Sequence, residues 1–239
     1  MDRTIAPSEQ EIVAGLGARL LKDRKRWLRP AAASGSRAVF GALAALYPTK
    51  NDIRDDVLAS MKELNARSDG AFADEFSAAM QAEYPRLAPI AASTQARFLL
   101  DVLWYAVRAP RGMQAFVTWA RGVGEAKELS IGDALNEEIV TIADLALAAG
   151  GDAAALGRSI EAWKTDKLIE GDELVAICGQ LRSDAMWEPL QSVLREQPDR
   201  ADWLILASAY DGYATALKRT RDETIDARYE TLARHDIDA

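Results

Sequence analysis

The sequence predicts an all-α protein of about ten to twelve mostly short antiparallel helices, forming a helical bundle or an irregular α-solenoid-like array. Apolar residues recur every three or four positions along almost the whole chain, which is the period of an amphipathic helix. Alanine, which is abundant here, is the strongest helix former and is depleted in strands. The expected turns are short and polar, which favours antiparallel neighbours.

In the first half of the chain, caps and prolines mark where the expected helices begin and end. Ser8 with Glu11 forms a capping box, so we expect a helix from Ser8 to about Leu28, before Pro30. Five further helices are expected at 37–47, from Thr49 or Asn51 to about 64, at 71–84 (before Pro85), at 95–109 and at 112–121. The helix at 95–109 is apolar on nearly every side, which predicts the central helix of this half.

The second half begins after a glycine-rich charged stretch at 122–128, which we interpret as a hinge. Ser130 is expected to cap a long helix that ends at Ala149, before the glycine pair 150–151. Shorter helices are expected at 153–165, 172–182, 184–197, 200–219 and 222–234, with Pro189 kinking or starting the third of these. The hinge suggests two domains, 1–124 and 125–239, although one continuous domain fits the same pattern.

One segment of the last third shows a local resemblance to a helical repeat. A tryptophan, a leucine, a small residue and a tyrosine are spaced as in the first helix of a tetratricopeptide repeat, at Trp203, Leu206, Ala207 and Tyr210. The resemblance ends there, because the small residues and the closing proline of that family's second helix are replaced by Arg219, Asp226 and Thr231.

The chain is poor in catalytic side chains, with 1 Cys and 1 His among 239 residues. A single cysteine excludes an intramolecular disulfide and any multi-cysteine metal site within one chain. A single histidine excludes paired-histidine zinc and di-iron motifs. Cys178 lies on an apolar helical stripe, as a buried thiol would, and His235 lies near the C-terminus. We therefore expect no catalytic residue, no metal and no cofactor.

Charge is distributed unevenly along the chain, whose formal net charge is −8. Residues 1–120 hold 16 Lys and Arg against 13 Asp and Glu, whereas residues 121–239 hold 13 against 24. The acidic second half would repel nucleic acid and anionic lipid. An anionic partner is therefore expected on the first half.

Candidate binding residues lie in two places. Six basic residues lie close together in the sequence, at the end of the first expected helix and just after it: Arg19, Lys22, Arg24, Lys25, Arg26 and Arg29. They could bind an acidic protein surface or, with Trp27 as a stacking group, the phosphates of a nucleic acid, although basic residues near a helix C-terminus also complement its dipole. Tyr210 and Tyr213, with Asp211 between them, could line a groove that binds a partner, although a place in the core between helices is the simpler reading of such aromatic residues.

Three groups of acids are candidates for a metal-dependent phosphohydrolase, because such chemistry without histidine needs clustered carboxylates. They are Asp52 with Asp55 and Asp56, Glu137 with Glu138 and Asp144, and Glu223 with Asp226 and Glu230. Helix capping and surface ion pairing explain acids at these positions equally well.

The function expected from these patterns is that of a non-catalytic adaptor or scaffold, which binds another protein through a helical groove or a charged face. A nucleic-acid-associated protein that uses the basic stretch 19–29 and an acidic-site phosphohydrolase are the alternatives. The longest apolar run, 98–107, contains Asp101 and is too short to cross a bilayer. We therefore expect a cytoplasmic protein with no membrane partner.

Overall fold

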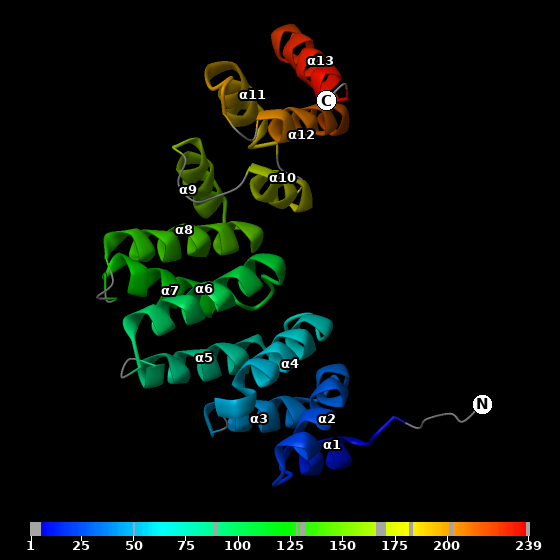
Figure 1. The fold of residues 1–239 in the computed structure, drawn as a ribbon, viewed down its shortest axis with the longest axis vertical. Helices are drawn as coiled ribbons and strands as arrows, with labels where there is room; N and C mark the ends of the chain where they lie inside the picture. The colour runs from blue at the N-terminus through cyan, green and yellow to red at the C-terminus, as the bar shows by residue number, and fades with distance from the viewer. Residues whose placement is uncertain are drawn as a thin grey trace, which may run out of the picture. The chain divides into compact units, whose positions relative to one another are not determined.

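The computed structural model confirms the all-α prediction. It describes residues 6–49, 51–87, 90–127, 129, 132–165, 171–181, 184–200 and 203–237. Within these residues there are thirteen α-helices, two short 3-10 helices and no strand (Figure 1). Thirteen rather than twelve helices form because the first expected helix is interrupted.

The chain divides into two compact units, Met1–Ala146 and Leu147–Ala239. The division falls near the end of the long helix α8 (Asp133–Ala149), whereas the sequence suggested a boundary after Gly124. Gly124 lies inside α7 (Gln114–Glu125), where a Cβ atom would come within 2.9 Å of the carbonyl oxygen of Asn136 in α8. This glycine therefore allows α7 and α8 to pack closely.

The first unit contains seven helices and most of α8. Before α7 the chain forms α1 (Glu9–Leu16), α2 (Leu21–Ala33), α3 (Arg37–Leu46), the 3-10 helices η1 (Tyr47–Thr49) and η2 (Asn51–Ile53), α4 (Arg54–Arg67), α5 (Ala73–Leu87) and α6 (Ala92–Arg108). Helix α1 packs against α2 and α3, α2 packs against α4, and α5 packs against α6 and α7.

Helix α1 begins as predicted and ends earlier than predicted. The Ser8 hydroxyl accepts a hydrogen bond from the Glu11 amide, and the Glu11 carboxylate accepts one from the Ser8 amide, so the capping box is present. The helix then stops before Gly17 and the chain reverses into α2. The reversal brings Trp27 onto Gly15, where a Cβ atom would lie 2.2 Å from the indole ring. The first expected helix is therefore a helical hairpin.

Two prolines expected to end helices lie inside them. Pro30 is within α2, which continues to Ala33, and Pro85 is within α5, which continues to Leu87. Both prolines stand in the last turn of their helix. The amide that each proline lacks would have formed a backbone hydrogen bond only at the end of the helix, so its loss does not interrupt the middle. Each helix therefore continues for two or three residues beyond the proline, although the sequence predicted that it would end before it.

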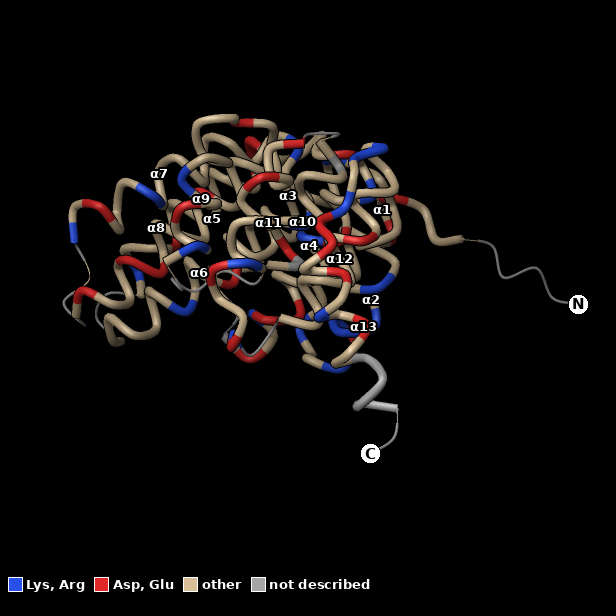
Figure 2. The backbone as a smooth tube through the Cα atoms, turned by 90° about the horizontal axis from the view of Figure 1, so that it is seen from above, with Lys and Arg blue, Asp and Glu red and all other residues tan. Residues whose placement is uncertain are grey.

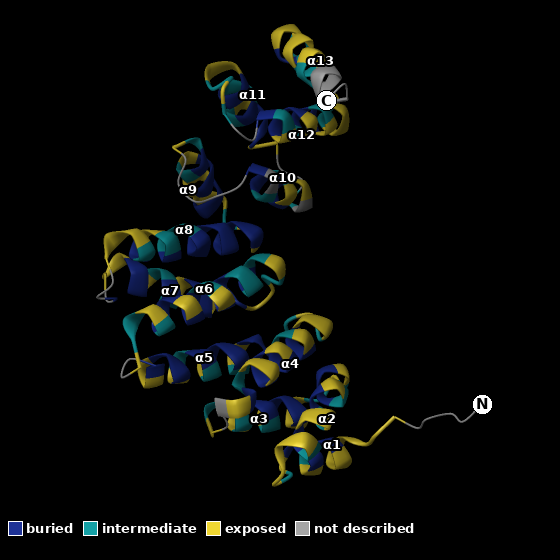
Figure 3. Cartoon of the chain, in the orientation of Figure 1, coloured by how far each residue is buried: buried dark blue, intermediate teal, exposed yellow. Residues whose placement is uncertain are grey.

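The core of the first unit consists of aliphatic and aromatic side chains that its helices turn towards one another. The stretches of ribbon that carry buried residues are dark blue in Figure 3. Among the fully buried residues are Val39, Phe40, Leu43, Val57, Met61, Leu64, Phe76, Met80, Leu99, Val102 and Phe116. Helix α6, expected as the central helix because its sequence is apolar on nearly every side, is buried on one face. Asp101 on its other face is exposed, and Trp104 is partly exposed.

The second unit holds the end of α8 and five more helices. These are α9 (Ala153–Lys164), α10 (Gly171–Gln180), α11 (Trp187–Glu196), α12 (Trp203–Leu217) and α13 (Glu223–Ile237). Helix α12 packs against α10, α11 and α13, and its buried face carries Trp203, Leu206, Ala207 and Tyr210. The spacing that resembles a repeat motif is thus the core stripe of α12.

Helix α8 ends at the glycine pair, as predicted. Gly151 has φ of +99°, and its amide donates to the Ala148 carbonyl at 2.9 Å. The next amide, of Asp152, reaches the Leu147 carbonyl at 3.0 Å, which completes a Schellman motif. The side chain of Asp152 then caps α9 by accepting from the Ala155 amide.

Candidate interaction surface and pocket

Four basic side chains on the α1–α2 hairpin are exposed, and no ion pair to a described residue engages them. We call them, with the two leucines described next, the basic hairpin patch: Arg19, Leu20, Leu21, Lys22, Arg26 and Arg29. Lys22, Arg26 and Arg29 follow one another at helical spacings of four and three, so they share the solvent face of α2. Figure 2 marks the Lys and Arg residues of α2 in blue.

Two exposed leucines lie beside these cations at the turn of the hairpin. Leu20 is 54% exposed and Leu21 is 40% exposed, which is unusual for large apolar side chains in this protein. Leu20 is the N-cap of α2, where its backbone is extended and no side chain caps the helix. The turn therefore combines apolar surface with positive charge, a combination that suits a partner with both apolar and acidic groups.

The other two residues of the basic stretch are engaged within the chain. Arg24 is only 6% exposed, and its Nη2 donates a hydrogen bond to the Ala18 carbonyl at 2.7 Å. Lys25 Nζ lies 2.8 Å from Asp56 Oδ2 on α4, and this hydrogen bond raises the pKa of Lys25. The structure thus leaves Arg24 and Lys25 out of the patch. They close the hairpin turn and join α2 to α4.

Trp27, expected as a stacking group for nucleic-acid bases, packs within the hairpin. Its ring covers Gly15, and the Arg26 guanidinium carbon lies 5.5 Å from the ring centroid. A base would have to displace these contacts in order to stack on the indole. The hairpin therefore lacks a free aromatic platform at this position.

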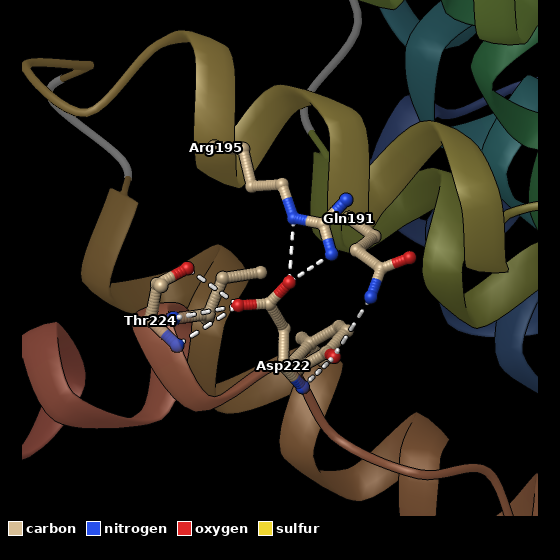
Figure 4. Close-up of polar contacts among 6 residues, drawn as sticks. Gln191, Arg195, Asp222 and Thr224 are labelled. Carbon is tan, nitrogen blue, oxygen red and sulfur yellow. Dashed lines mark hydrogen bonds and ion pairs between the residues drawn. The ribbon is translucent and has the colours of Figure 1, made fainter.

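Tyr210 and Tyr213, candidates for a groove or for the core, are buried in the second unit. Tyr210 is 1% exposed and stacks on Trp187 with ring centroids 4.9 Å apart. Its hydroxyl accepts a hydrogen bond from the Asp222 amide at 2.8 Å (Figure 4). Burial raises the pKa of Tyr213 to about 12. Both side chains belong to the core that α12 organises, so the groove that the sequence allowed does not form around them.

Asp222, not singled out in the sequence, organises the polar contacts around this core. Its carboxylate accepts hydrogen bonds from the Thr224 amide at 2.9 Å and from the Thr224 hydroxyl, and it pairs with Arg195 on α11 (Figure 4). The bonds from Thr224 and from Arg195 lower its pKa to about 2. Asp222 is therefore the N-terminal cap of α13 and a tie between α13 and α11. The sequence signal was available, since Asp222 is the first residue of the helix expected at 222–234 and aspartate is a favoured N-cap.

The acidic groups considered as metal sites are dispersed. Among the described residues, no three carboxylate, histidine or cysteine side chains lie close enough together to hold a metal ion. Asp56 pairs with Lys25, and Asp144 accepts a hydrogen bond from Arg121 Nε at 2.8 Å. These contacts are ion pairs between helices, which gives the phosphohydrolase alternative no geometric support.

Cys178 and His235 are the remaining residues that the sequence singled out. Cys178 is fully buried in the second unit, and burial raises the pKa of its thiol to about 11, which opposes formation of a nucleophilic thiolate. His235 lies in α13, but its side chain falls outside the described residues.

A pocket of about 500 Å³ lies in the first unit between α4 and α6. Its walls are formed by Arg54, Asp55, Leu58, Ala59 and Lys62 of α4, by Thr94, Arg97, Phe98 and Asp101 of α6, and by Tyr47 and Leu87. The amino-acid sequence did not predict this pocket. The only signal was that residues 54, 55, 58, 59 and 62 share a second face of the expected helix, beside its apolar stripe.

A buried ion pair supports one wall of this pocket. Arg54 pairs with Glu83 of α5, a carboxylate that is 1% exposed, and its guanidinium carbon lies 5.3 Å from the ring centroid of Tyr47. Lys62 Nζ lies 2.6 Å from Asp101 Oδ2, so a second ion pair joins α4 to α6 across the pocket. These pairs hold the lining side chains in defined positions.

No helix within the described residues is both long and apolar enough to cross a membrane. Neither the protein-family models, nor the curated proteins, nor the solved structures with which the chain was compared match it. Any function therefore has to follow from the surface and the pocket described above.

Proposed function

We propose that this chain is a non-catalytic adaptor that binds an acidic segment of another protein on its basic hairpin patch. The observation that carries the proposal is that one helical hairpin exposes two leucines together with four cations that have no ion-pair partner among the described residues. Carboxylates of a partner would pair with Lys22, Arg26 and Arg29, and apolar side chains would cover the leucines. Such charge complementarity favours recognition and orientation of a partner.

The same features favour a protein over a nucleic acid. A phosphate backbone has no apolar group for Leu20 and Leu21 to contact, and Trp27 packs against Gly15. The chain as a whole carries a net charge of −8, which opposes a long polyanion more than a short acidic peptide. An amphipathic acidic helix carries carboxylates on one face and apolar side chains on another, so it can pair with the cations and cover the leucines of the hairpin at the same time.

The scaffold beneath the patch supports the proposal. Arg24 bonds to the Ala18 carbonyl, Lys25 pairs with Asp56, and Trp27 fills the space over Gly15, so the hairpin is tied to itself and to α4. A surface that is ordered before binding loses less entropy when a partner docks.

The experiment measures binding of a fluorescent peptide rich in glutamate, with leucines at helical spacing, to the full chain by anisotropy. The double variant Arg26→Glu and Arg29→Glu reverses two charges of the patch. The matched control is Arg108→Glu with Lys218→Glu, two exposed basic residues that likewise have no ion pair to a described residue. We expect the patch variant to weaken binding roughly tenfold or more and the control to leave it within about twofold.

Two further arms separate the partner classes. Leu20→Ser with Leu21→Ser should weaken the peptide complex by roughly fivefold, because the apolar contact is lost while the cations remain. A DNA duplex is tested under the same salt conditions. If the duplex binds more tightly than the peptide, or if the patch variant and its control weaken peptide binding equally, the proposal is wrong.

A further inference from the structure

The pocket between α4 and α6 has the size and lining of a small-molecule site. Its volume of about 500 Å³ lies within the range that ligand pockets occupy in proteins. Leu58 and Ala59 on α4, Leu87 at the end of α5 and Phe98 on α6 form its apolar surface. A ligand that fills it therefore needs an apolar body.

One hydrogen-bond donor in the lining is open to a ligand. Tyr47 is 2% exposed, it lines the pocket, and its hydroxyl makes no hydrogen bond to any described residue. The Arg54 Nε atom also lacks an acceptor, but it is buried and so lies out of reach of a ligand. A ligand that supplies an acceptor atom would give the Tyr47 hydroxyl a hydrogen bond inside the pocket. This hydroxyl therefore points to a ligand with an acceptor atom.

Charge in the lining favours an anion. Arg97 is exposed at the pocket and forms no ion pair with a described residue. Arg54 and Lys62 are also cationic, and each already has one carboxylate, from Glu83 and Asp101. Asp55 is the acid in the lining that no ion pair to a described residue engages. A carboxylate on a ligand would thus meet Arg97, with the Tyr47 hydroxyl in the same lining, whereas a cation would meet Asp55 and be repelled by Arg97.

We propose that this pocket binds a small amphipathic anion, with a carboxylate or phosphate head at Arg97 and the Tyr47 hydroxyl and with an apolar body on Leu58, Leu87 and Phe98. This site is separate from the basic hairpin patch, so it adds a ligand to the proposed adaptor and does not depend on that function. The Arg54–Glu83 pair and its contact with Tyr47 order one wall before the ligand arrives.

The experiment titrates the full chain with decanoate and with decyl phosphate by isothermal calorimetry. Decyltrimethylammonium serves as the cation with a matched tail. We expect both anions to bind and the cation to bind at least tenfold more weakly. Arg97→Gln should weaken decanoate roughly tenfold, Tyr47→Phe roughly threefold, and Ala59→Trp should abolish binding by filling the pocket.

The matched control is Arg67→Gln, an exposed arginine of α4 that lies outside the pocket lining. It should leave the affinity for decanoate unchanged, while circular dichroism verifies that every variant is folded. The inference is overturned if neither anion binds, if the cation binds as tightly as the anions, or if Arg97→Gln and Arg67→Gln weaken decanoate to the same extent. Binding that survives Ala59→Trp in a folded chain also overturns it.

Discussion

Gly15 shows how a single side chain decides the shape of the hairpin. Because a Cβ atom there would lie 2.2 Å from the Trp27 ring, Gly15→Ala should force the two helices apart and lower the free energy of unfolding by about 1–3 kcal/mol. The matched control is Gly41→Ala in α3, where no atom lies within 4 Å of the added methyl group. It should be neutral or stabilising by up to about 1 kcal/mol. Urea unfolding measures both, and equal effects would contradict the prediction.

Asp222 makes stability depend on pH. Its pKa is lowered from 3.8 to about 2, so its ionised form is favoured in the folded chain. The resulting stabilisation is complete above about pH 4 and is lost as the pH falls towards about 2. Asp222→Asn keeps a capping oxygen and removes the charge, so the variant should be less stable than wild type near neutral pH, by no more than about 1 kcal/mol because Arg195 is half-exposed.

The measurement is the difference in urea unfolding between wild type and Asp222→Asn, followed from neutral pH to about pH 2. That difference should shrink as the pH falls through the window between 3.8 and about 2. Asp199→Asn, whose side chain is fully exposed in the same unit, is the control and should show little difference at any pH. A constant difference for Asp222→Asn would mean that the charge plays no part.

At the scale of residues, the sequence shows which side chains are basic better than it shows which of them face the solvent. It identified the basic stretch, and five of its six cations are exposed on one hairpin, four of them without an ion pair to a described residue. It could not show that Arg24 would turn inwards, because the acceptor is the Ala18 carbonyl, freed only when the helix breaks. Nor could it pair Lys25 with Asp56, which lie on different helices.

At the scale of elements, the buried pair between α4 and α5 should be costly to break. Glu83→Ala leaves Arg54 partly buried without its carboxylate, so we expect a loss of about 3 kcal/mol in the free energy of unfolding. Replacing both partners, Arg54→Met with Glu83→Met, should cost less than the single substitution, because no buried charge is left unpaired. Thermal or urea unfolding compares the variants. A double variant less stable than Glu83→Ala would show that the pair itself stabilises the fold.

Helix ends that depend on local chemistry were predicted well. The Ser8 capping box and the Gly151 terminus are both present, since each needs only neighbouring residues. The break at Gly17 was missed, because it is stabilised by Trp27 folding back onto Gly15, a contact between helices. The one-sided burial of α6 was missed for the same reason, since periodicity identifies apolar positions but not which neighbour covers them.

At the scale of the whole molecule, sequence patterns could not predict the pocket, because its lining comes from separate elements. The lining includes Tyr47 of η1, Arg54 of α4 and Arg97 of α6, which form one pocket only when α4 lies beside α6. The charge asymmetry, in contrast, follows from counting residues. It places the basic hairpin patch in the less acidic half, where an acidic partner meets less repulsion.

The division into Met1–Ala146 and Leu147–Ala239 predicts that local damage stays within one unit. Gly15→Ala disturbs the α1–α2 hairpin, whereas Asp222→Ala removes the cap of α13 at a cost of about 1 kcal/mol. Because each substitution acts on contacts inside one compact unit, their effects should be independent and add in the double variant. Hydrogen exchange measured by mass spectrometry reports the local stability of each helix, so it shows in which helices each substitution acts.

We expect Gly15→Ala to accelerate exchange in α1 and α2 and to leave α11, α12 and α13 at wild-type rates. Asp222→Ala should do the reverse, since Asp222 ties α13 to Arg195 of α11 and its amide bonds to Tyr210 of α12. Independent units open separately, so each change lowers the free energy of opening only where its contacts lie. If either substitution accelerates exchange equally in both sets of helices, the chain unfolds as one cooperative body and the two units are not energetically separate.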